Sequence, residues 1–516
     1  MNKKIIYLIL ILAIAAFFRF YNLTIIPPGL YPDEAMNGNN AIESLENNHF
    51  KIFYPENNGR EGLFINIQAL FLKLIQKNEP WVLRLPSAIF GFLTVLGIYF
   101  LALELFKKIK NYKLEKDLEE ENKLKTSNQF NFNEKIALFS AFILATCFWH
   151  INFSRIGFRA IMAPFLSVWA IYFLLKSLNN LKNKNFYVYA ILGGIFFGLG
   201  FYTYIAYRIM PLLLLPIFWF YFKKTKLENL TKNFYFNWSI FLLTTFFVAL
   251  PIGIYFLKNP KDFFGRTTQI SIFNSGHLWQ DLFLNILKTL GMFNFVGDFN
   301  WRHNLAGKPE LDAIIGLFFL LGIWLLIKNR KDENIKFINW ILFSWFILAM
   351  LPVIISNEGL PHALRAILML PPVIIISAFG GIMLYEKLMS SPKIYQNIKN
   401  QKLVSALSII LLLVVLLNSY SNYFIVWANN QNTKDAFSAN YVELGKTLNS
   451  LPKEIKKYIV VEAQGVLVKN IPMPAQTVMF ITNTYLEKYQ KEKNIFYILP
   501  EKQNEIPSGA LIFNLK

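Results

Sequence analysis

Two adjacent carboxylates, Asp33 and Glu34, are the first residues whose type and position suggest chemistry. They follow a proline-bounded stretch, and residues 27–35 read PPGLYPDEA. A structural role is an open alternative, because Asp after Pro favours the start of a helix and Glu suits its first turn. The two roles are compatible, since a helix N-terminus keeps a carboxylate ionised and a general base must be ionised and fixed. We therefore predict that Asp33 is a catalytic base and that Glu34 orients an acceptor or a metal ion.

Two short basic motifs suggest a site for phosphate. Residues 154–159 read SRIGFR and residues 361–365 read PHALR, so Arg155 and Arg159, and likewise His362 and Arg365, share a face if helical. Guanidinium groups bind phosphate through paired hydrogen bonds. The structural alternative is that these side chains reach from helix ends toward the membrane surface or cap a helix. The functional alternative is that these basic residues bind an anionic lipid headgroup, with Arg155 and Arg159 on its phosphate.

Weaker candidates lie before the second apolar run and in a later loop. Residues 59–62 read GREG, Arg84 follows, and residues 300–304 read NWRHN with Lys308 nearby. Each set alone is typical of a solvated loop. We include Arg60, Glu61 and Arg84 among the predicted substrate-binding residues. The spacing of Asp33, Glu34 and His362 leaves a divalent metal ion open without identifying one.

The composition indicates which elements must position these residues. The chain has 516 residues, of which 54% are hydrophobic and 16% are charged, whereas soluble domains average about 25% charged. Its net charge of +20 comes from lysines in short loops between apolar runs, as membrane insertion arranges them, so we do not expect nucleic-acid binding. The single cysteine, Cys147, excludes an intrachain disulfide and a thiolate metal site.

Eleven apolar runs predict an all-α polytopic membrane bundle, because a run of about 18 residues is long enough to span the hydrocarbon core. Two further apolar segments, 63–74 and 278–295, predict helices that lie parallel to the membrane surface. The predicted spans are residues 5–20, 83–106, 136–151, 161–178, 187–204, 207–222, 238–257, 311–327, 338–355, 366–385 and 403–424.

The lysine-rich loops predict the orientation. Lys3 and Lys4 and the loops around residues 107–135, 182–184, 223–226, 328–336 and 387–402 fall on one side of an eleven-span arrangement. That side is predicted to be cytoplasmic. The acidic pair and the basic motifs then lie on the opposite, outer face, where an anionic lipid headgroup would account for arginines in short external loops. We predict a multi-pass protein of the plasma membrane with an extracytoplasmic site.

The tail has a different character, which predicts two domains: a transmembrane catalytic domain over residues 1–425 and a small α/β extracytoplasmic domain over residues 426–516. A helical stretch is expected near residues 435–448. Short runs rich in β-formers follow, separated by Pro and Gly. These predicted strands are residues 458–462, 478–482, 495–499 and 510–515.

Other catalytic signatures are missing from the sequence, including a Walker A motif, Gly-x-Ser-x-Gly and His-Glu-x-x-His. The rival interpretation is a transporter or a flippase for a lipid-linked glycan. Transporters place ionisable residues at mid-membrane, whereas the ionisable residues here lie at the outer ends of the apolar runs. The pattern therefore favours chemistry at the membrane surface.

In the order of these motifs the chain resembles the GT-C superfamily of integral membrane glycosyltransferases. The likeness is to the branch that holds protein O-mannosyltransferases and aminoarabinose transferases of lipid A, and it covers most of residues 5–385. The motifs that carry it are PGLYPDEA with Asp33 and Glu34, GREGL from Gly59, RLPS from Arg84, SRIGFRA from Ser154 and PHALRA from Pro361.

The resemblance implies an inverting transfer of a sugar from a polyprenyl-phosphate or dolichyl-phosphate donor to a protein, lipid or polysaccharide acceptor. On the matching positions, Asp33 would be the base, and Arg155, Arg159, His362 and Arg365 would contact the donor phosphate or the acceptor. The loop 152–159 contains no carboxylate, whereas some relatives have a second acid near there.

Overall fold

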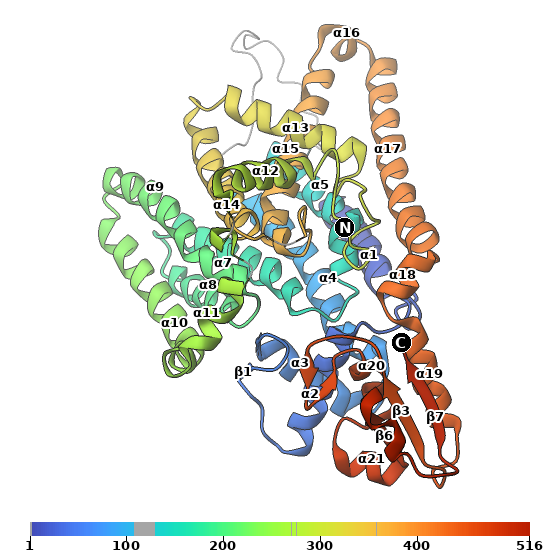
Figure 1. The fold of residues 1–516 in the computed structure, drawn as a ribbon. Coiled ribbons are helices and arrows are strands. Elements are labelled where there is room, and N and C mark those ends of the chain that lie inside the picture. The colour runs from blue at the N-terminus through green and yellow to red at the C-terminus, as the bar shows by residue number, and fades with distance from the viewer. Residues whose placement is uncertain (1–2, 108–129, 270, 275, 358) are drawn as a thin grey trace.

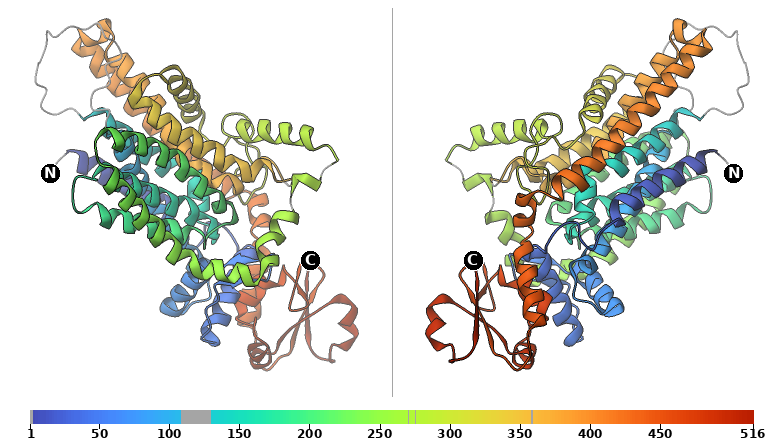
Figure 2. Two further views of the ribbon diagram at one scale, coloured as in Figure 1. Left: turned by 90° about the vertical axis from the view of Figure 1, so that its left-hand side faces the viewer. Right: turned by 90° about the vertical axis from the view of Figure 1, so that its right-hand side faces the viewer.

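The computed structural model describes residues 3–107, 130–269, 271–274, 276–357 and 359–516. A bundle of long helices carries a small sheet domain at one end (Figures 1 and 2). The segment that joins α1 (Lys3–Phe20) to the next long helix lies between the bundle and the sheet domain (Figures 1 and 2). Most of the predicted lysine-rich loop 107–135 lies outside the described residues.

Seven helices of the described chain are long and apolar enough to cross a membrane, and each coincides with a predicted span. Three of them begin with a 3₁₀ turn and one ends in a π-helix. They are α4 (Pro80–Leu105), η1 with α7 (Arg159–Asn179), η2 with α9 (Ile205–Leu227), α10 (Thr231–Lys258), the main part of α14 (Ile335–Ile354), η4 with α15 (Arg365–Met389) and α17 with η5 (Ile398–Trp427).

The other four predicted spans are helical but shorter or more polar, so the count of eleven is not confirmed. They correspond to α1 (Lys3–Phe20), with two lysines and an arginine, to α8 (Phe186–Gly200) and α13 (Ala313–Lys328), and to a pair, α5 (Phe132–Thr146) and α6 (Phe148–Phe153).

The predicted span 136–151 is interrupted at Cys147, whose backbone is extended between α5 and α6. The break leaves carbonyl groups at the end of α5 without helical partners. The buried Arg19 guanidinium donates to two of them, Leu144 O at 2.8 Å and Ala145 O at 2.5 Å, and lies 2.7 Å from His150 Nδ1. A buried cation on α1 therefore stabilises the interruption.

The segments predicted to lie along the membrane surface are helices in the structure. The segment between α1 and α4 (residues 21–79, the α1–α4 segment) contains α2 (Pro32–Glu46), a two-stranded antiparallel pair and α3 (Leu63–Ile75). The pair joins β1 (Phe53–Tyr54) to β2 (Arg60–Glu61). A later segment contains α11 (Pro260–Gln269), η3 (Ile272–Asn274) and α12 (Leu278–Gly291). On α12 the buried positions are polar, Asn285 and Thr289, while large apolar side chains such as Phe283 and Leu287 are exposed, as suits a helix facing lipid.

The C-terminal region folds around a three-stranded parallel sheet in the order β6–β3–β7. Three predicted strands are confirmed as β3 (Lys457–Val461), β6 (Ile495–Ile498) and β7 (Leu511–Leu515). The predicted strand 478–482 is wrong, because it is the end of helix α20 (Ala475–Thr482). Every residue of α20 is buried, so its sequence lacks the polar spacing that marks a helix. The remaining elements are α16 (Pro392–Tyr395), α18 (Gln431–Ala436), α19 (Ala439–Ser450), β4 (Leu467–Val468), β5 (Ile471–Pro472), α21 (Glu487–Lys493) and η6 (Pro500–Glu505).

The sheet domain packs directly on the α1–α4 segment (Figure 1). Phe480 of α20 and Val442 of α19 share an apolar cluster with Leu30, Ala35 and other residues of that segment. Polar contacts join the same surfaces, because Thr477 Oγ1 donates to Leu30 O at 2.9 Å and Asn39 of α2 donates to the Gln476 side chain at 2.9 Å. The helix that begins at Pro32 is thus held between the bundle and the sheet domain.

Candidate active site

A cavity of about 510 Å³ lies where the α1–α4 segment, the bundle and the sheet domain meet. Charged side chains of both signs line it, together with aromatic and amide groups. The residues that line it include Tyr31, Asp33, Asn37, Asn57, Arg60, Glu61, Phe158, Arg159, Arg208, Asp262, His362, Arg365, Gln464, Gly465 and Val466.

Asp33 reaches this cavity from the first turn of α2. The sequence explains the placement: Pro32 fits the first helical position, where a missing N–H costs nothing, and Tyr31 is the extended residue before it. Asn57 donates a hydrogen bond to Asp33 Oδ1 at 2.7 Å, and the Tyr31 side chain is a second hydrogen-bond partner. Burial, and then the charge of Asp33, raises the pKa of Tyr31 to about 12, so its phenol stays protonated at neutral pH. The carboxylate is therefore fixed by neutral donors and remains half-buried beside the cavity.

Glu34 faces the interior instead. Its side chain is fully buried, and it accepts from Arg84 Nε at 2.9 Å, from a second Arg84 nitrogen at 3.1 Å and from the Gly157 backbone N–H at 2.7 Å. Arg84 also donates to Pro27 O and Gly29 O, at 2.6 and 2.9 Å. Neither side chain lines the cavity, so the structure does not bring Glu34 and Arg84 to the site with Asp33.

Arg155 is also directed away from the cavity. Its guanidinium is buried and donates to the backbone carbonyls of Phe18, Tyr21 and Ile26 at 2.8–3.1 Å. It lies 5.2 Å from the Phe424 ring centroid. These contacts join the end of α1, the loop after it and η5, which is a structural arrangement rather than a phosphate site.

Four arginines reach the cavity: Arg60, Arg159, Arg208 and Arg365. Arg159 Nε donates to Glu61 Oε2 at 2.8 Å, and Arg208 lies 3.8 Å from Glu61 Oε1. One carboxylate therefore holds two guanidinium groups side by side at the cavity wall.

Arg60 is held by neutral amides rather than by a carboxylate. It donates to Asn37 Oδ1 at 2.7 Å and to Asn40 Oδ1 at 2.5 Å. Burial, and then the nearby Arg159, lowers its pKa to about 10, so it stays charged at neutral pH. The predicted residues Arg60, Glu61, Arg159 and Arg365 thus share a cavity with Asp33.

His362 lines the cavity next to Arg365 and belongs to a largely buried cluster. Asp298 Oδ2 accepts from the Ala363 N–H at 2.8 Å, contacts His303 Nδ1 at 2.9 Å and lies 3.9 Å from His362 Nδ1. Burial, and then the neighbouring His303 and Arg365, lowers the pKa of His362 well below its usual value, so its imidazole is neutral at pH 7. Burial likewise lowers the pKa of His303.

The donor atoms of Asp298, His303 and His362 lie within 4.8 Å of one another. One carboxylate and two neutral imidazoles fit a divalent transition metal ion, because such ions prefer nitrogen and oxygen ligands of this kind. An ion there would replace the contact between His303 and Asp298. The predicted alternative at Asp33 and Glu34 fits less well, since Glu34 is occupied by Arg84.

Several groups that line the cavity, or that contact the residues lining it, were not among the predicted site residues. Arg208 lies within an apolar run, and its proximity to Glu61 is visible only in three dimensions. Arg302 stacks on the Tyr31 ring, 3.9 Å from its centroid, and the loop motif NWRHN is the signal that pointed to it and to His303. Gln464, Gly465 and Val466 reach the cavity from the sheet domain, and no motif marks them.

No family model and no curated protein sequence matches the chain. Among solved structures, the oligosaccharyltransferase AglB of Archaeoglobus fulgidus with dolichol-phosphate is similar at a TM-score of 0.53 and 13% identity, over 97% of this chain and 70% of that one. ArnT of Cupriavidus metallidurans bound to undecaprenyl phosphate is similar at a TM-score of 0.51 and 12% identity, over 93% of this chain and 85% of that one. The chain has the GT-C fold.

This assignment confirms the resemblance drawn from the motifs, and it concerns the fold alone, because the identities are low. In AglB tethered with an acceptor peptide the match reaches a TM-score of 0.53 at 14% identity over 98% of this chain, but the chain spans only 65% of that protein's length. Within the GT-C fold of this chain, the cavity beside Asp33 is where acidic and basic side chains converge.

Proposed function

We propose that the protein is a multi-pass membrane glycosyltransferase that takes its sugar from a polyprenyl-phosphate donor. One observation carries this proposal: the Asp33 carboxylate and four guanidinium groups line one cavity. A group that takes up a proton and groups that neutralise a leaving phosphate are the two components that such a transfer needs.

Asp33 acts as the general base. An acceptor hydroxyl or amine attacks the anomeric carbon of the sugar while its proton passes to the Asp33 carboxylate. The bond between the anomeric carbon and the phosphate oxygen breaks, and the lipid phosphate leaves with the bonding electrons. The single displacement inverts the anomeric configuration, through a transition state of oxocarbenium character.

The arginines stabilise the charge that develops on the leaving phosphate. Arg159 and Arg208 are held side by side by Glu61, so their orientation costs little when a phosphate binds. Arg60 and Arg365 lie along the same cavity, with His362 beside them. Glu34, Arg84 and Arg155 support this site from behind by fixing the loops that carry Asp33 and Arg159, rather than by touching substrate.

The fold relatives are compatible with a lipid-phosphate donor. One AglB structure is a complex with dolichol-phosphate, and one ArnT structure contains undecaprenyl phosphate. If a divalent ion is held by Asp298, His303 and His362, it adds positive charge at the edge of the cavity. The acceptor, whether protein, lipid or polysaccharide, would enter from the side of Gln464 and Gly465 in the sheet domain, on the outer face of the plasma membrane.

The test is incubation of the purified full chain with a panel of radiolabelled polyprenyl-phosphate sugars, followed by product analysis. The proposal expects transfer from at least one donor and its loss in Asp33→Asn. No transfer from any donor, together with movement of a lipid-linked glycan across liposomes, would favour the flippase interpretation.

A further inference from the structure

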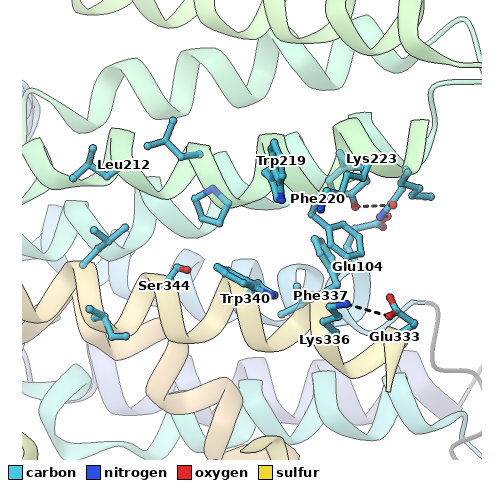
Figure 3. Close-up of a pocket in the computed structure, with 18 of the residues that line it drawn as sticks. Glu104, Leu212, Trp219, Phe220, Lys223, Glu333, Lys336, Phe337, Trp340 and Ser344 are labelled. Atoms are coloured by element: carbon cyan, nitrogen blue, oxygen red, sulfur yellow. Dashed lines mark hydrogen bonds and ion pairs between the residues drawn. The ribbon is translucent and has the colours of Figure 1, made fainter. Parts of the chain in front are cut away.

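A second and larger cavity, of about 1010 Å³, lies on the side of the bundle between α9 (Leu214–Leu227) and α14 (Glu333–Ile354). Figure 3 shows Trp219 and Phe220 of α9 facing Phe337 and Trp340 of α14 across it. The Phe220 and Phe337 rings are 4.3 Å apart, and this contact joins the two helices. Trp219 and Trp340 are each more than half exposed, so the cavity is a groove open to the surroundings of the bundle.

The groove has an apolar part and a basic end. Leu215, Ile347 and Leu348 line the apolar part. Lys223, Lys224 and Lys336 line the end nearest the lysine-rich loops. Each tryptophan is four residues from one of these lysines, Trp219 from Lys223 and Trp340 from Lys336, which places them one helical turn apart. Tryptophan and lysine at such spacing mark the boundary between hydrocarbon and headgroups.

The acidic groups near this end do not neutralise the positive charge of the three lysines. Glu104 already accepts from Asn179 at 2.8 Å and from Lys107 at 3.1 Å. Glu333 and Glu228 are exposed and meet Lys336 and Lys224 at 3.1 and 3.9 Å, which are weak contacts on a helix surface. Lys223 is exposed and lies over the Trp219 ring, 4.5 Å from its centroid.

The length of the apolar part matches one leaflet of a bilayer. Leu215 and Lys224 are nine residues apart on α9, which corresponds to about 14 Å of helix. Half of a hydrocarbon core is about 15 Å thick. An amphiphile that fills this groove would therefore have its negative headgroup at the lysines and a chain that ends near the bilayer centre.

We propose that this groove is a binding site for an anionic glycerophospholipid of the leaflet on the lysine-rich side. Its phosphate is held by Lys223, Lys224 and Lys336, and an acyl chain lies along Leu215 and Ile347. This site does not depend on the proposed transfer reaction, which takes place in the other cavity.

The test is native mass spectrometry of the purified full chain in detergent, titrated with phosphatidylglycerol and, separately, with phosphatidylcholine of the same acyl chains. We expect a saturable phosphatidylglycerol adduct that phosphatidylcholine does not match. In Lys223→Gln/Lys224→Gln/Lys336→Gln the affinity should fall at least about tenfold, since each basic residue near a membrane surface favours an anionic lipid.

A charge-matched variant, Lys182→Gln/Lys184→Gln/Lys399→Gln, removes three lysines from other loops of the same end and should keep the adduct. Ser344→Trp, which fills the groove without changing its charge, should also lose the adduct while keeping the gel-filtration profile of the folded protein. Equal losses in the two lysine variants, equal binding of phosphatidylcholine, or displacement of phosphatidylglycerol by equimolar polyprenyl phosphate would each overturn the proposal.

Discussion

Asp33 and Glu34 are adjacent at the start of α2, yet their carboxylates meet different surroundings. Asp33 is half-buried beside the cavity and is bonded by the Asn57 amide. Glu34 is fully buried against Arg84, with Nε and Oε2 2.9 Å apart. We therefore expect substitution of Asp33 to reduce catalysis and substitution of Glu34 to reduce stability.

For Asp33→Asn we expect loss of sugar transfer by about 10²–10⁴-fold, which is what a general base typically contributes. The asparagine can still accept from Asn57, so donor binding and the thermal unfolding midpoint should stay near those of the wild type. Asp435→Asn is a control, because Asp435 is an exposed carboxylate of α18 outside the cavity. Full activity in Asp33→Asn would remove Asp33 from the role of base.

For Glu34→Gln or Arg84→Gln we expect destabilisation by about 3–5 kcal/mol, because breaking a buried pair leaves one charge uncompensated. The measurement is thermal unfolding in detergent, compared with Asp33→Asn. The double variant Glu34→Gln/Arg84→Gln should be destabilised by less than the sum of the two single destabilisations. If Glu34→Gln unfolds at the wild-type temperature but has no activity, Glu34 acts on substrate and our assignment of a structural role is wrong.

For Arg159→Gln and Arg208→Gln we expect weaker binding of the lipid phosphate, by about tenfold or more each, because a charge-assisted hydrogen bond contributes about 1.5–3 kcal/mol. Binding of polyprenyl phosphate can be followed by competition with a labelled donor. Arg330→Gln is the control, because it removes one positive charge from the exposed loop after α13. This variant should bind polyprenyl phosphate with the affinity of the wild type. Unchanged affinity in both cavity variants would contradict the phosphate site.

For the cluster of Asp298, His303 and His362, we expect Zn²⁺ or Mn²⁺ to raise the unfolding midpoint of protein first stripped with a chelator, because a ligand that binds only the folded state stabilises it. The variant His303→Gln/His362→Gln should lose this shift. His49→Gln/His277→Gln is a matched control that leaves the cluster intact. The same metal-dependent shift in both variants would exclude the cluster as the site.

For Phe480→Ala we expect a loss of stability of about 3–5 kcal/mol, as for other fully buried aromatic side chains, together with reduced transfer. Phe480 packs against the α1–α4 segment, so its removal should loosen the helix that carries Asp33. Phe496→Ala, at a partly exposed position of β6, should cost less and leave transfer intact. Equal effects of the two substitutions would mean that the sheet domain does not support the site.

The sequence was sufficient to predict the helical bundle and most of the sheet domain, because long apolar runs and strand-forming segments leave local signals. The sequence also led us to predict that acidic and basic residues from distant positions meet at one face, and Asp33, Arg159, His362 and Arg365 do line one cavity. Local sequence patterns could not show that the Arg155 guanidinium would donate its hydrogen bonds to the backbone carbonyls of Phe18, Tyr21 and Ile26.

The same limit applies to ion pairs and to buried helices. Glu34 and Arg84 are 50 positions apart, and nothing near either residue marks the pairing. The end of α20, residues 478–482, was mistaken for a strand because burial on all sides removes the periodicity on which the distinction depends. The count of eleven spans, the orientation and the domain boundary at residue 425, which falls within η5, remain predictions.

The packing of α20 on α2 has a consequence for biosynthesis. The helix that carries Asp33 is synthesised well before its partners in α20, because Asn39 and Gln476, which are hydrogen-bonded, lie 437 positions apart. Since domains form in the order of their synthesis, α2 lacks these contacts until α20 has been synthesised. The surroundings of Asp33 are therefore complete only after α20 has been delivered to the same side of the membrane as α2.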